Sequence, residues 1–204
     1  MHELIHAAAV LHRARCLPAT DGNLSARLDQ RRVVITKAGI EKRELVENSF
    51  VVTSLDEPIP EHVSSEWPMH RAIYLARSDV GCILHVHAPF LSSFAIAGHI
   101  PDVNLLTETQ LLIGQITLVP FAVPGSNALA ESLLAQSPTA NVYLLANHGV
   151  VAVGQTAAIA LHRLERAEFL AEISIHAAAI GGGIPLNAAQ ISELETAYSK
   201  RSSC

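Results

Sequence analysis

The chain has 204 residues, of which 50% are hydrophobic and 16% charged, and its formal net charge is -5. This length suffices for one well-filled core, so we expect a single domain over residues 1–204. The sequence has no Lys/Arg cluster, which disfavours nucleic acid as a partner. It also has no apolar run of the roughly twenty residues that a membrane helix needs, so part of the apolar excess is expected between subunits.

The three cysteines have unrelated spacings, and the first residues lack the basic and then apolar layout of a secretory signal. Both features predict a cytoplasmic protein. Residues 3–14 alternate apolar and polar residues at helical spacing and predict an amphipathic first helix.

Residues 19–27 read ATDGNLSAR, a small polar stretch that we interpret as a turn leading into a strand at 32–36. The side chains of Asn23 and Ser25, with nearby backbone N–H groups, could also face a phosphate. A second polar turn, TKAG at 36–39, follows the strand and adds Thr36 and Gly39 to the candidate phosphate ligands. Two such turns favour phosphate binding more than either does separately.

A helix is predicted from Ser64 or Ser65 to about residue 76, with Glu66 in its first turn. A Ser-Ser-Glu start can simply cap a helix by satisfying its free N–H groups. The same start exposes two hydroxyls and a carboxylate at the positive end of the helix, which suits a phosphate or a metal ion. This motif alone leaves both interpretations open.

The stretch GCILHVHAP carries the strongest signal, because it is an apolar run with two histidines one residue apart. In a strand over residues 80–87, a period of two places His85 and His87 on one face, where they can share a metal ion. Glu66, and His148 in the ANHG stretch, can supply the other half of the site. Three imidazoles and a carboxylate suit Zn²⁺, with the carboxylate as the ligand that substrate displaces most easily.

The remaining sequence alternates predicted helices and strands without an internal repeat. Helices are predicted at 88–97, 105–113 and 128–135 and from 156 to the glycines at 181–183, and strands at 51–53, 116–121, 142–146 and 150–153. The last two strands are expected to form a hairpin around residues 147–149. Asn187 is expected to cap a final helix that carries Tyr198.

In their order along residues 1–180, these motifs resemble the class II aldolase/adducin family, whose sugar-phosphate members include fuculose-1-phosphate aldolases. The matching motifs are GNLS at 22–25, TKAG at 36–39, SSE at 64–66, HVH at 85–87, PGS at 124–126 and NHG at 147–149. The resemblance implies an α/β fold with three α/β/α layers and a mostly antiparallel central sheet. It also implies a homotetramer, a Zn²⁺ near a subunit interface and a sugar phosphate as the small-molecule partner.

The resemblance also assigns roles by motif position. It implies that the metal ligands are Glu66, His85, His87 and His148. It implies that the substrate phosphate is bound by Asn23, Ser64 and Ser65 together with the turn at 36–39. Ala38 departs from the pattern, because the aldolases usually have a serine there. The missing hydroxyl corresponds to roughly 0.5–1.5 kcal/mol of hydrogen bonding, which weakens phosphate binding without abolishing it.

The implied reaction cleaves the C3–C4 bond of a ketose 1-phosphate and leaves an enediolate, whose negative charge a divalent cation can share. Glu66 is expected to carry a proton to or from the carbon, which suits a carboxylate with a raised pKa. A second proton leaves the C4 hydroxyl, but the tyrosines that serve this end in the family are missing from residues 105–114. Glu108 is the candidate there, with Gln110 as an alternative, and Tyr198 could reach the site from the same or an adjacent subunit.

Other functions remain open. The phrase LPAT at 17–20, before GNLS, looks like the methylthioribulose-1-phosphate dehydratases, whereas Glu66 directly after two serines favours an aldolase. A sugar-phosphate epimerase, which tends to have aspartate at the Glu66 position, or a decarboxylase is a further alternative. A binding module like the adducin head lacks the metal set, but all four positions are filled here. The sequence therefore predicts a zinc-dependent aldolase.

Overall fold

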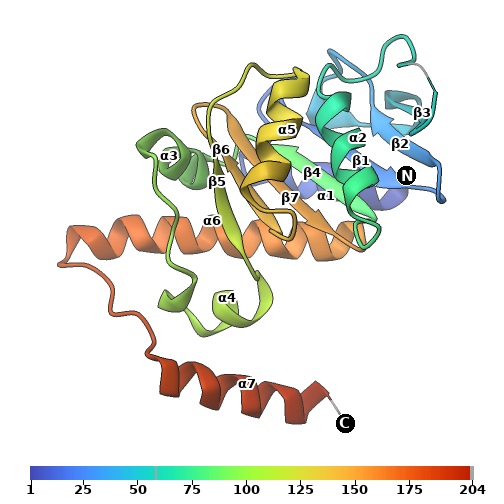
Figure 1. The fold of residues 1–204 in the computed structure, drawn as a ribbon. Coiled ribbons are helices and arrows are strands. Elements are labelled where there is room, and N and C mark those ends of the chain that lie inside the picture. The colour runs from blue at the N-terminus through green and yellow to red at the C-terminus, as the bar shows by residue number, and fades with distance from the viewer. Residues whose placement is uncertain (58, 203–204) are drawn as a thin grey trace.

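The computed structural model describes residues 1–57 and 59–202 (Figure 1). The helices are α1 (His2–Arg13), α2 (Trp67–Ala76), α3 (Pro89–Ala97), α4 (Thr107–Leu112), α5 (Asn127–Gln136), α6 (Ala157–Ala179) and α7 (Ala188–Ser202). The strands are β1 (Asn23–Arg27), β2 (Arg32–Thr36), β3 (Phe50–Ser54), β4 (Cys82–Val86), β5 (Ile116–Val119), β6 (Val142–Leu145) and β7 (Gly149–Gly154).

The strands form one seven-stranded sheet in the order β3-β2-β1-β4-β7-β6-β5. Every neighbouring pair is antiparallel except β5 and β6, which are parallel. The parallel pair exists because α5 connects the two strands as a crossover, whereas a tight turn connects β6 to β7. The predicted α/β class is confirmed, and the sheet is mixed.

Helices cover both faces of the sheet and make it the middle of three layers. In Figure 1, α2 and α5 lie on the face turned towards the viewer, and α6 runs behind the strands. Alternate residues of β4 feed the two cores, because Leu84 packs in the cluster with α1 and α6 while Ile83 packs in the cluster with α2 and α5. In the same view α7 lies apart from the layers, beyond α4.

Residues 23–27 form strand β1, so the predicted turn is wrong for this segment. β1 pairs with β2 on one side and β4 on the other. Its side chains alternate: Leu24 packs in the core with α1 and α6, whereas Asn23 and Ser25 hydrogen-bond to side chains from the start and first turn of α2. This strand tolerates polar residues because their hydrogen bonds are made across to the helix.

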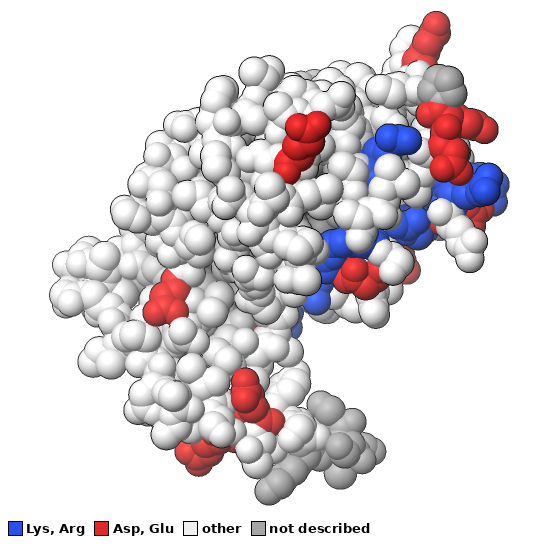
Figure 2. Space-filling view, viewed as in Figure 1, with Lys and Arg blue, Asp and Glu red and all other residues white. Residues whose placement is uncertain are grey.

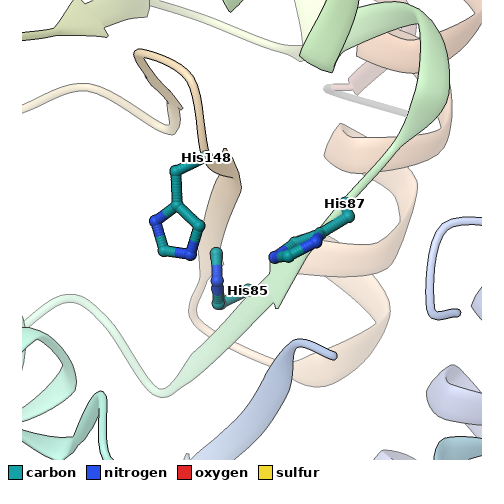
Figure 3. Close-up of side chains that lie close together, drawn as sticks. All are labelled: His85, His87 and His148. Carbon is teal, nitrogen blue, oxygen red and sulfur yellow. The ribbon is translucent and has the colours of Figure 1, made fainter. Parts of the chain in front are cut away.

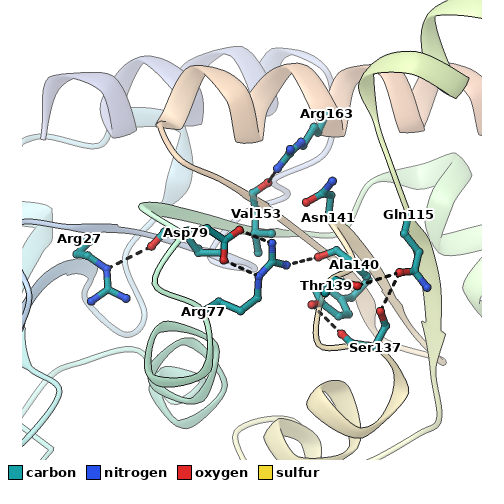
Figure 4. Close-up of polar contacts among 12 residues, drawn as sticks. Arg27, Arg77, Asp79, Gln115, Ser137, Thr139, Ala140, Asn141, Val153 and Arg163 are labelled. Atoms are coloured by element: carbon teal, nitrogen blue, oxygen red, sulfur yellow. Dashed lines mark hydrogen bonds and ion pairs between the residues drawn. The ribbon is translucent and has the colours of Figure 1, made fainter. Parts of the chain in front are cut away.

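Arginines close the end of the sheet where β4 begins and β7 ends (Figure 4). The guanidinium of Arg77 lies 2.6 Å from the Asp79 carboxylate and also donates to the Ala140 carbonyl. Arg163 of α6 donates to the carbonyl of Val153 at 2.7 Å. These contacts join the loop before β4 to the loop before β6, and α6 to β7.

The surface carries few charges and mixes their signs. On the face shown in Figure 2, Lys and Arg side chains lie beside Asp and Glu along one side, and most of the remaining surface is uncharged. Within residues 1–57 and 59–202, no helix combines the length and the apolar character needed to cross a bilayer.

Candidate metal centre and substrate pocket

Three histidines approach one another at the end of the sheet where β4 ends and β7 begins (Figure 3). His85 lies in β4, His87 directly follows that strand, and His148 lies in the turn between β6 and β7. One ring nitrogen of each lies within 4.8 Å of the others, and the ring centroids are 4.8–5.4 Å apart. A zinc–nitrogen bond is about 2.0–2.1 Å long, so small side-chain shifts bring imidazoles this close onto one ion.

Two residues of the NHG motif place His148. Asn147 adopts a left-handed conformation with a φ of 57°, which asparagine tolerates better than most residues. Gly149 leaves room for the site, because a Cβ there would lie 2.6 Å from the Val86 carbonyl oxygen and 2.8 Å from the His87 ring. The hairpin predicted around this motif is confirmed, but the glycine is required by this close approach and not by the turn.

Glu66 comes from the start of α2 and meets two of the imidazoles. Its Oε2 lies 2.8 Å from His85 Nε2, and its Oε1 lies 3.4 Å from His148 Nε2. Burial raises the pKa of Glu66, but the nearby His85 and the hydrogen bond from Asn23 outweigh it, and the pKa lies below its ordinary value. The structure therefore holds an ionised carboxylate, where the sequence argument expected a raised pKa.

The arrangement fits a bound cation. His85 Nδ1 lies 3.0 Å from the Val150 carbonyl, which can only accept, so Nδ1 carries a hydrogen and Nε2 is the ring nitrogen turned towards Glu66. This nitrogen lies 2.8 Å from Glu66 Oε2, a contact that either a proton on Nε2 or a metal ion bound to both groups satisfies. Burial lowers the pKa of His148 to about 4 and also lowers that of His87, which keeps both rings in the neutral form that binds metals.

Further contacts orient this donor set. Nδ1 of His87 lies 3.6 Å from the carboxylate of Asp21, a residue that the sequence argument did not single out. Glu66 Oε2 accepts a hydrogen bond of 2.8 Å from the side-chain amide of Asn23. Such outer contacts fix which nitrogen of each ring and which oxygen of the carboxylate faces a metal.

A pocket with a volume of about 230 Å³ lies against the centre. Glu66, His87 and His148 line it, and among the predicted phosphate ligands so do Asn23, Gly39, Ser64 and Ser65. Larger hollows exist elsewhere, such as one of about 390 Å³ between α2 and α5, but the histidines do not line it. The pocket beside the histidines is therefore the candidate substrate pocket, because proposed metal ligands line it.

Two predicted phosphate ligands lie outside this lining. Ser25 is fully buried, and its hydroxyl contacts His70 and Tyr74 at 2.7 and 2.8 Å. Thr36 is also fully buried, and its hydroxyl accepts a hydrogen bond from the backbone N–H of Leu24. Both side chains are engaged in the interior of the protein.

Lys42 joins the two polar turns of the pocket. Its side chain is buried, and Nζ donates to the carbonyls of Thr20 and Ile40 at 2.8 and 2.7 Å. Burial lowers its pKa. Lys37 also lines the pocket and is only partly buried, so it is the lysine with the more accessible charge.

The predicted acid/base residues lie on other elements. Glu108 is exposed on α4, where its carboxylate accepts a hydrogen bond of 2.7 Å from Thr107. Tyr198 lies on α7 and is 41% exposed. In the described part of the chain, the pocket lining includes neither residue, nor Gln110. Their catalytic roles stay predictions.

Residues 2–175 match the sequence model of the family described as Class II Aldolase and Adducin N-terminal domain. The chain belongs to this family. The solved structure of an L-fuculose 1-phosphate aldolase is similar with a TM-score of 0.84 and 25% identity, covering 97% of this chain and 95% of that chain. The family expected from the motifs is thus confirmed.

Two sequence relatives differ in the reaction that their names give. The 5-methylthioribulose-1-phosphate/5-deoxyribulose-1-phosphate aldolase of Rhodospirillum rubrum is 32% identical over 176 residues, 84% of this chain and 78% of the relative. The methylthioribulose-1-phosphate dehydratase of Bradyrhizobium sp. (strain BTAi1) is 28% identical over 173 residues, 76% of this chain and 80% of the relative. The relatives thus include both an aldolase and a dehydratase.

Proposed function

We propose that the protein is a divalent-metal-dependent aldolase that cleaves a ketose 1-phosphate between C3 and C4 and releases dihydroxyacetone phosphate and an aldehyde. The observation that carries this proposal is the meeting of His85, His87, His148 and Glu66 beside a polar pocket. The proposal includes the single domain, the homotetramer and the cytoplasmic location expected from the sequence.

The donor set suits Zn²⁺, and a bound divalent cation supplies positive charge that stabilises negative charge developing on the substrate oxygens. His85, His87 and His148 are the neutral ligands in this proposal, and Glu66 is the fourth. The Glu66 carboxylate also accepts a hydrogen bond from Asn23. This hydrogen bond would still hold the carboxylate if substrate took its place on the cation.

The phosphate group would lie at the start of α2. Ser64, Ser65 and Gly39 line the pocket there, at the positively polarised end of the helix. Asn23 donates one amide hydrogen to Glu66 and has a second one for the phosphate. Lys37 adds a positive charge next to Ala38, where the family hydroxyl is missing.

Glu66 is the residue proposed to move a proton. Its Oε1 has no hydrogen-bond partner among the described residues, although it is buried. In cleavage this oxygen would first take a proton from water and then deliver it to C3, and in the reverse direction it would remove that proton from C3. The proton of the C4 hydroxyl needs another acceptor, and Glu108 and Tyr198 remain the proposed candidates, with an adjacent subunit as one source.

A dehydratase of 5-methylthioribulose 1-phosphate is the second candidate. It is favoured by the relatives, because a dehydratase and an aldolase match this chain at 28% and 32% identity with comparable coverage. Both relatives are named for a methylthioribulose 1-phosphate. The substrate class is therefore the same for both candidates, and they differ in the bond that breaks.

The test is to incubate zinc-loaded protein with 5-deoxyribulose, 5-methylthioribulose and fuculose 1-phosphates. Dihydroxyacetone phosphate is assayed by coupled NADH oxidation, and dehydrated diketo product by NMR. We expect dihydroxyacetone phosphate from at least one substrate, its loss on treatment with a chelator and its return on adding Zn²⁺. Diketo product without dihydroxyacetone phosphate would establish the dehydratase instead. Neither product, with no uptake of divalent ion, would leave a binding module.

A further inference from the structure

A row of buried polar side chains runs from α2 through β1 to the candidate metal centre. Tyr74 OH lies 2.8 Å from Ser25 Oγ, which lies 2.7 Å from His70 Nδ1. The other ring nitrogen of His70 lies 2.5 Å from Asn23 Oδ1, and the Asn23 amide lies 2.8 Å from Glu66 Oε2. None of these five residues is more than 6% exposed. We call them the Tyr74–Glu66 chain.

The direction of each hydrogen bond follows from the orientation of the Asn23 side chain. Its amide nitrogen, which only donates, faces Glu66, and its carbonyl oxygen faces His70. That oxygen only accepts, so His70 must carry its hydrogen on Nε2. Burial lowers the pKa of His70 to about 3, so the ring is neutral and Nδ1 is an acceptor.

The same reasoning completes the other half of the chain. Ser25 has one hydroxyl hydrogen, which goes to His70 Nδ1, so its oxygen accepts from the hydroxyl of Tyr74. Every donor in the chain therefore points towards Glu66. Aligned hydrogen bonds in a buried environment polarise one another, so the amide hydrogen that reaches Glu66 is a stronger donor than an isolated amide.

We propose that His70 is a positioning residue, which holds the Glu66 carboxylate in its metal-binding orientation through Asn23. This inference rests on the proposed role of Glu66 as a metal ligand. His70 touches neither the pocket nor the three imidazoles in the contacts of the described residues, so it acts only through Asn23 and through the backbone of its own helix. The Tyr74–Glu66 chain also explains why β1 has the polar residues Asn23 and Ser25 in the interior.

The first test needs no substitution and no substrate. Long-range ¹H–¹⁵N NMR of the metal-free protein at pH 7 reports which ring nitrogen of each histidine carries hydrogen. We expect His70 as the Nε2–H tautomer with an unprotonated Nδ1. The Nδ1–H tautomer or a doubly protonated ring would overturn the proposal, whatever reaction the protein catalyses.

The second test measures the affinity of the protein for Co²⁺ from its visible absorption. We expect His70→Leu to weaken Co²⁺ binding by about 10–100-fold, as the loss of other outer contacts does. His70→Gln retains an amide donor and should recover part of the loss. Tyr74→Phe removes only the far hydroxyl and should have a smaller effect in the same direction.

Tyr143→Phe is the matched control, because Tyr143 is a fully buried tyrosine in the same core whose hydroxyl donates to the Ser137 carbonyl instead. This variant should bind Co²⁺ as the parent does. Parent affinity in His70→Leu, or equal losses in Tyr74→Phe and Tyr143→Phe, would refute the positioning role. If both tests give the expected results but the proposed reaction is absent, the proposed aldolase function is wrong and the role of His70 in the Tyr74–Glu66 chain is still supported.

Discussion

Gly149 offers a direct way to disturb the candidate metal centre without removing a ligand. A Cβ at this position would lie 2.6 Å from the Val86 carbonyl oxygen, 2.8 Å from His87 Cδ2 and 3.2 Å from His85 Cε1. Its φ is not in the positive range, so alanine is compatible with the local backbone. Gly149→Ala must therefore displace the two imidazoles, the end of β4, or both.

The size of the effect follows from this crowding. Overpacking by one methyl group costs roughly 1–3 kcal/mol. At about 2–4 °C per kcal/mol for a chain of this size, the Tm should fall by about 2–12 °C. Moving two proposed ligands should also weaken zinc binding by on the order of 10–100-fold. Activity should fall with the bound zinc.

Gly154→Ala at the other end of β7 is the matched control. Its Cβ would lie 2.6 Å from the backbone nitrogen of Ala160 and 3.0 Å from Ile159, with no imidazole nearby. Circular dichroism of the metal-free proteins should show a lower Tm for both variants, whereas chelator competition should show weaker zinc binding for Gly149→Ala alone. Parent zinc affinity in Gly149→Ala, or equal weakening in both, would refute this reasoning.

Four further substitutions test separate parts of the structure. His87→Ala should lose most zinc and activity together, and unchanged zinc in metal analysis would contradict its role. Glu66→Gln should keep some zinc while initial rates fall by on the order of a hundredfold or more, and parent rates would reduce Glu66 to a helix cap. Arg77→Met removes buried guanidinium contacts and should lower the free energy of unfolding in urea by about 1.5–3 kcal/mol without changing zinc affinity. Burial raises the pKa of Glu168 above 4.5. The contribution of this carboxyl group to the free energy of unfolding is therefore present below pH 4.5 and is lost as the pH rises through the raised pKa. In urea unfolding between pH 4.5 and 7, Glu168→Gln should not show that loss.

Signals that depend on neighbouring residues were predictable from the sequence. Ser126, Thr156 and Asn187 cap α5, α6 and α7, each by accepting a hydrogen bond from a backbone N–H three residues later. Such a cap depends only on one short polar side chain and the following turn. The His-x-His strand was equally clear, because a short apolar run predicts a buried strand and the two histidines at its end follow the period of two.

Strand β1 and its site residues could not be predicted in the same way. Asn23 and Ser25 look like turn residues, and they are buried because partners 43 and 45 positions away satisfy them. Nothing near them in the sequence reveals those partners. Asp21 and His87 are also far apart in the sequence, so their contact became visible only in the folded chain. The same holds for the burial of Ser25.

The register of three strands determines whether these residues meet. Asn23 of β1 lies opposite His85 of β4, and Val151 of β7 lies opposite the same histidine on the other side. A slip of β4 by one residue would turn His85 towards α1 and α6, away from Glu66. Such a slip would also exchange Leu84 and Ile83 between the two cores and bury the His85 ring among apolar side chains without its present partners, which opposes it. The packing that stabilises the sheet thus sets the position of the candidate metal ligand.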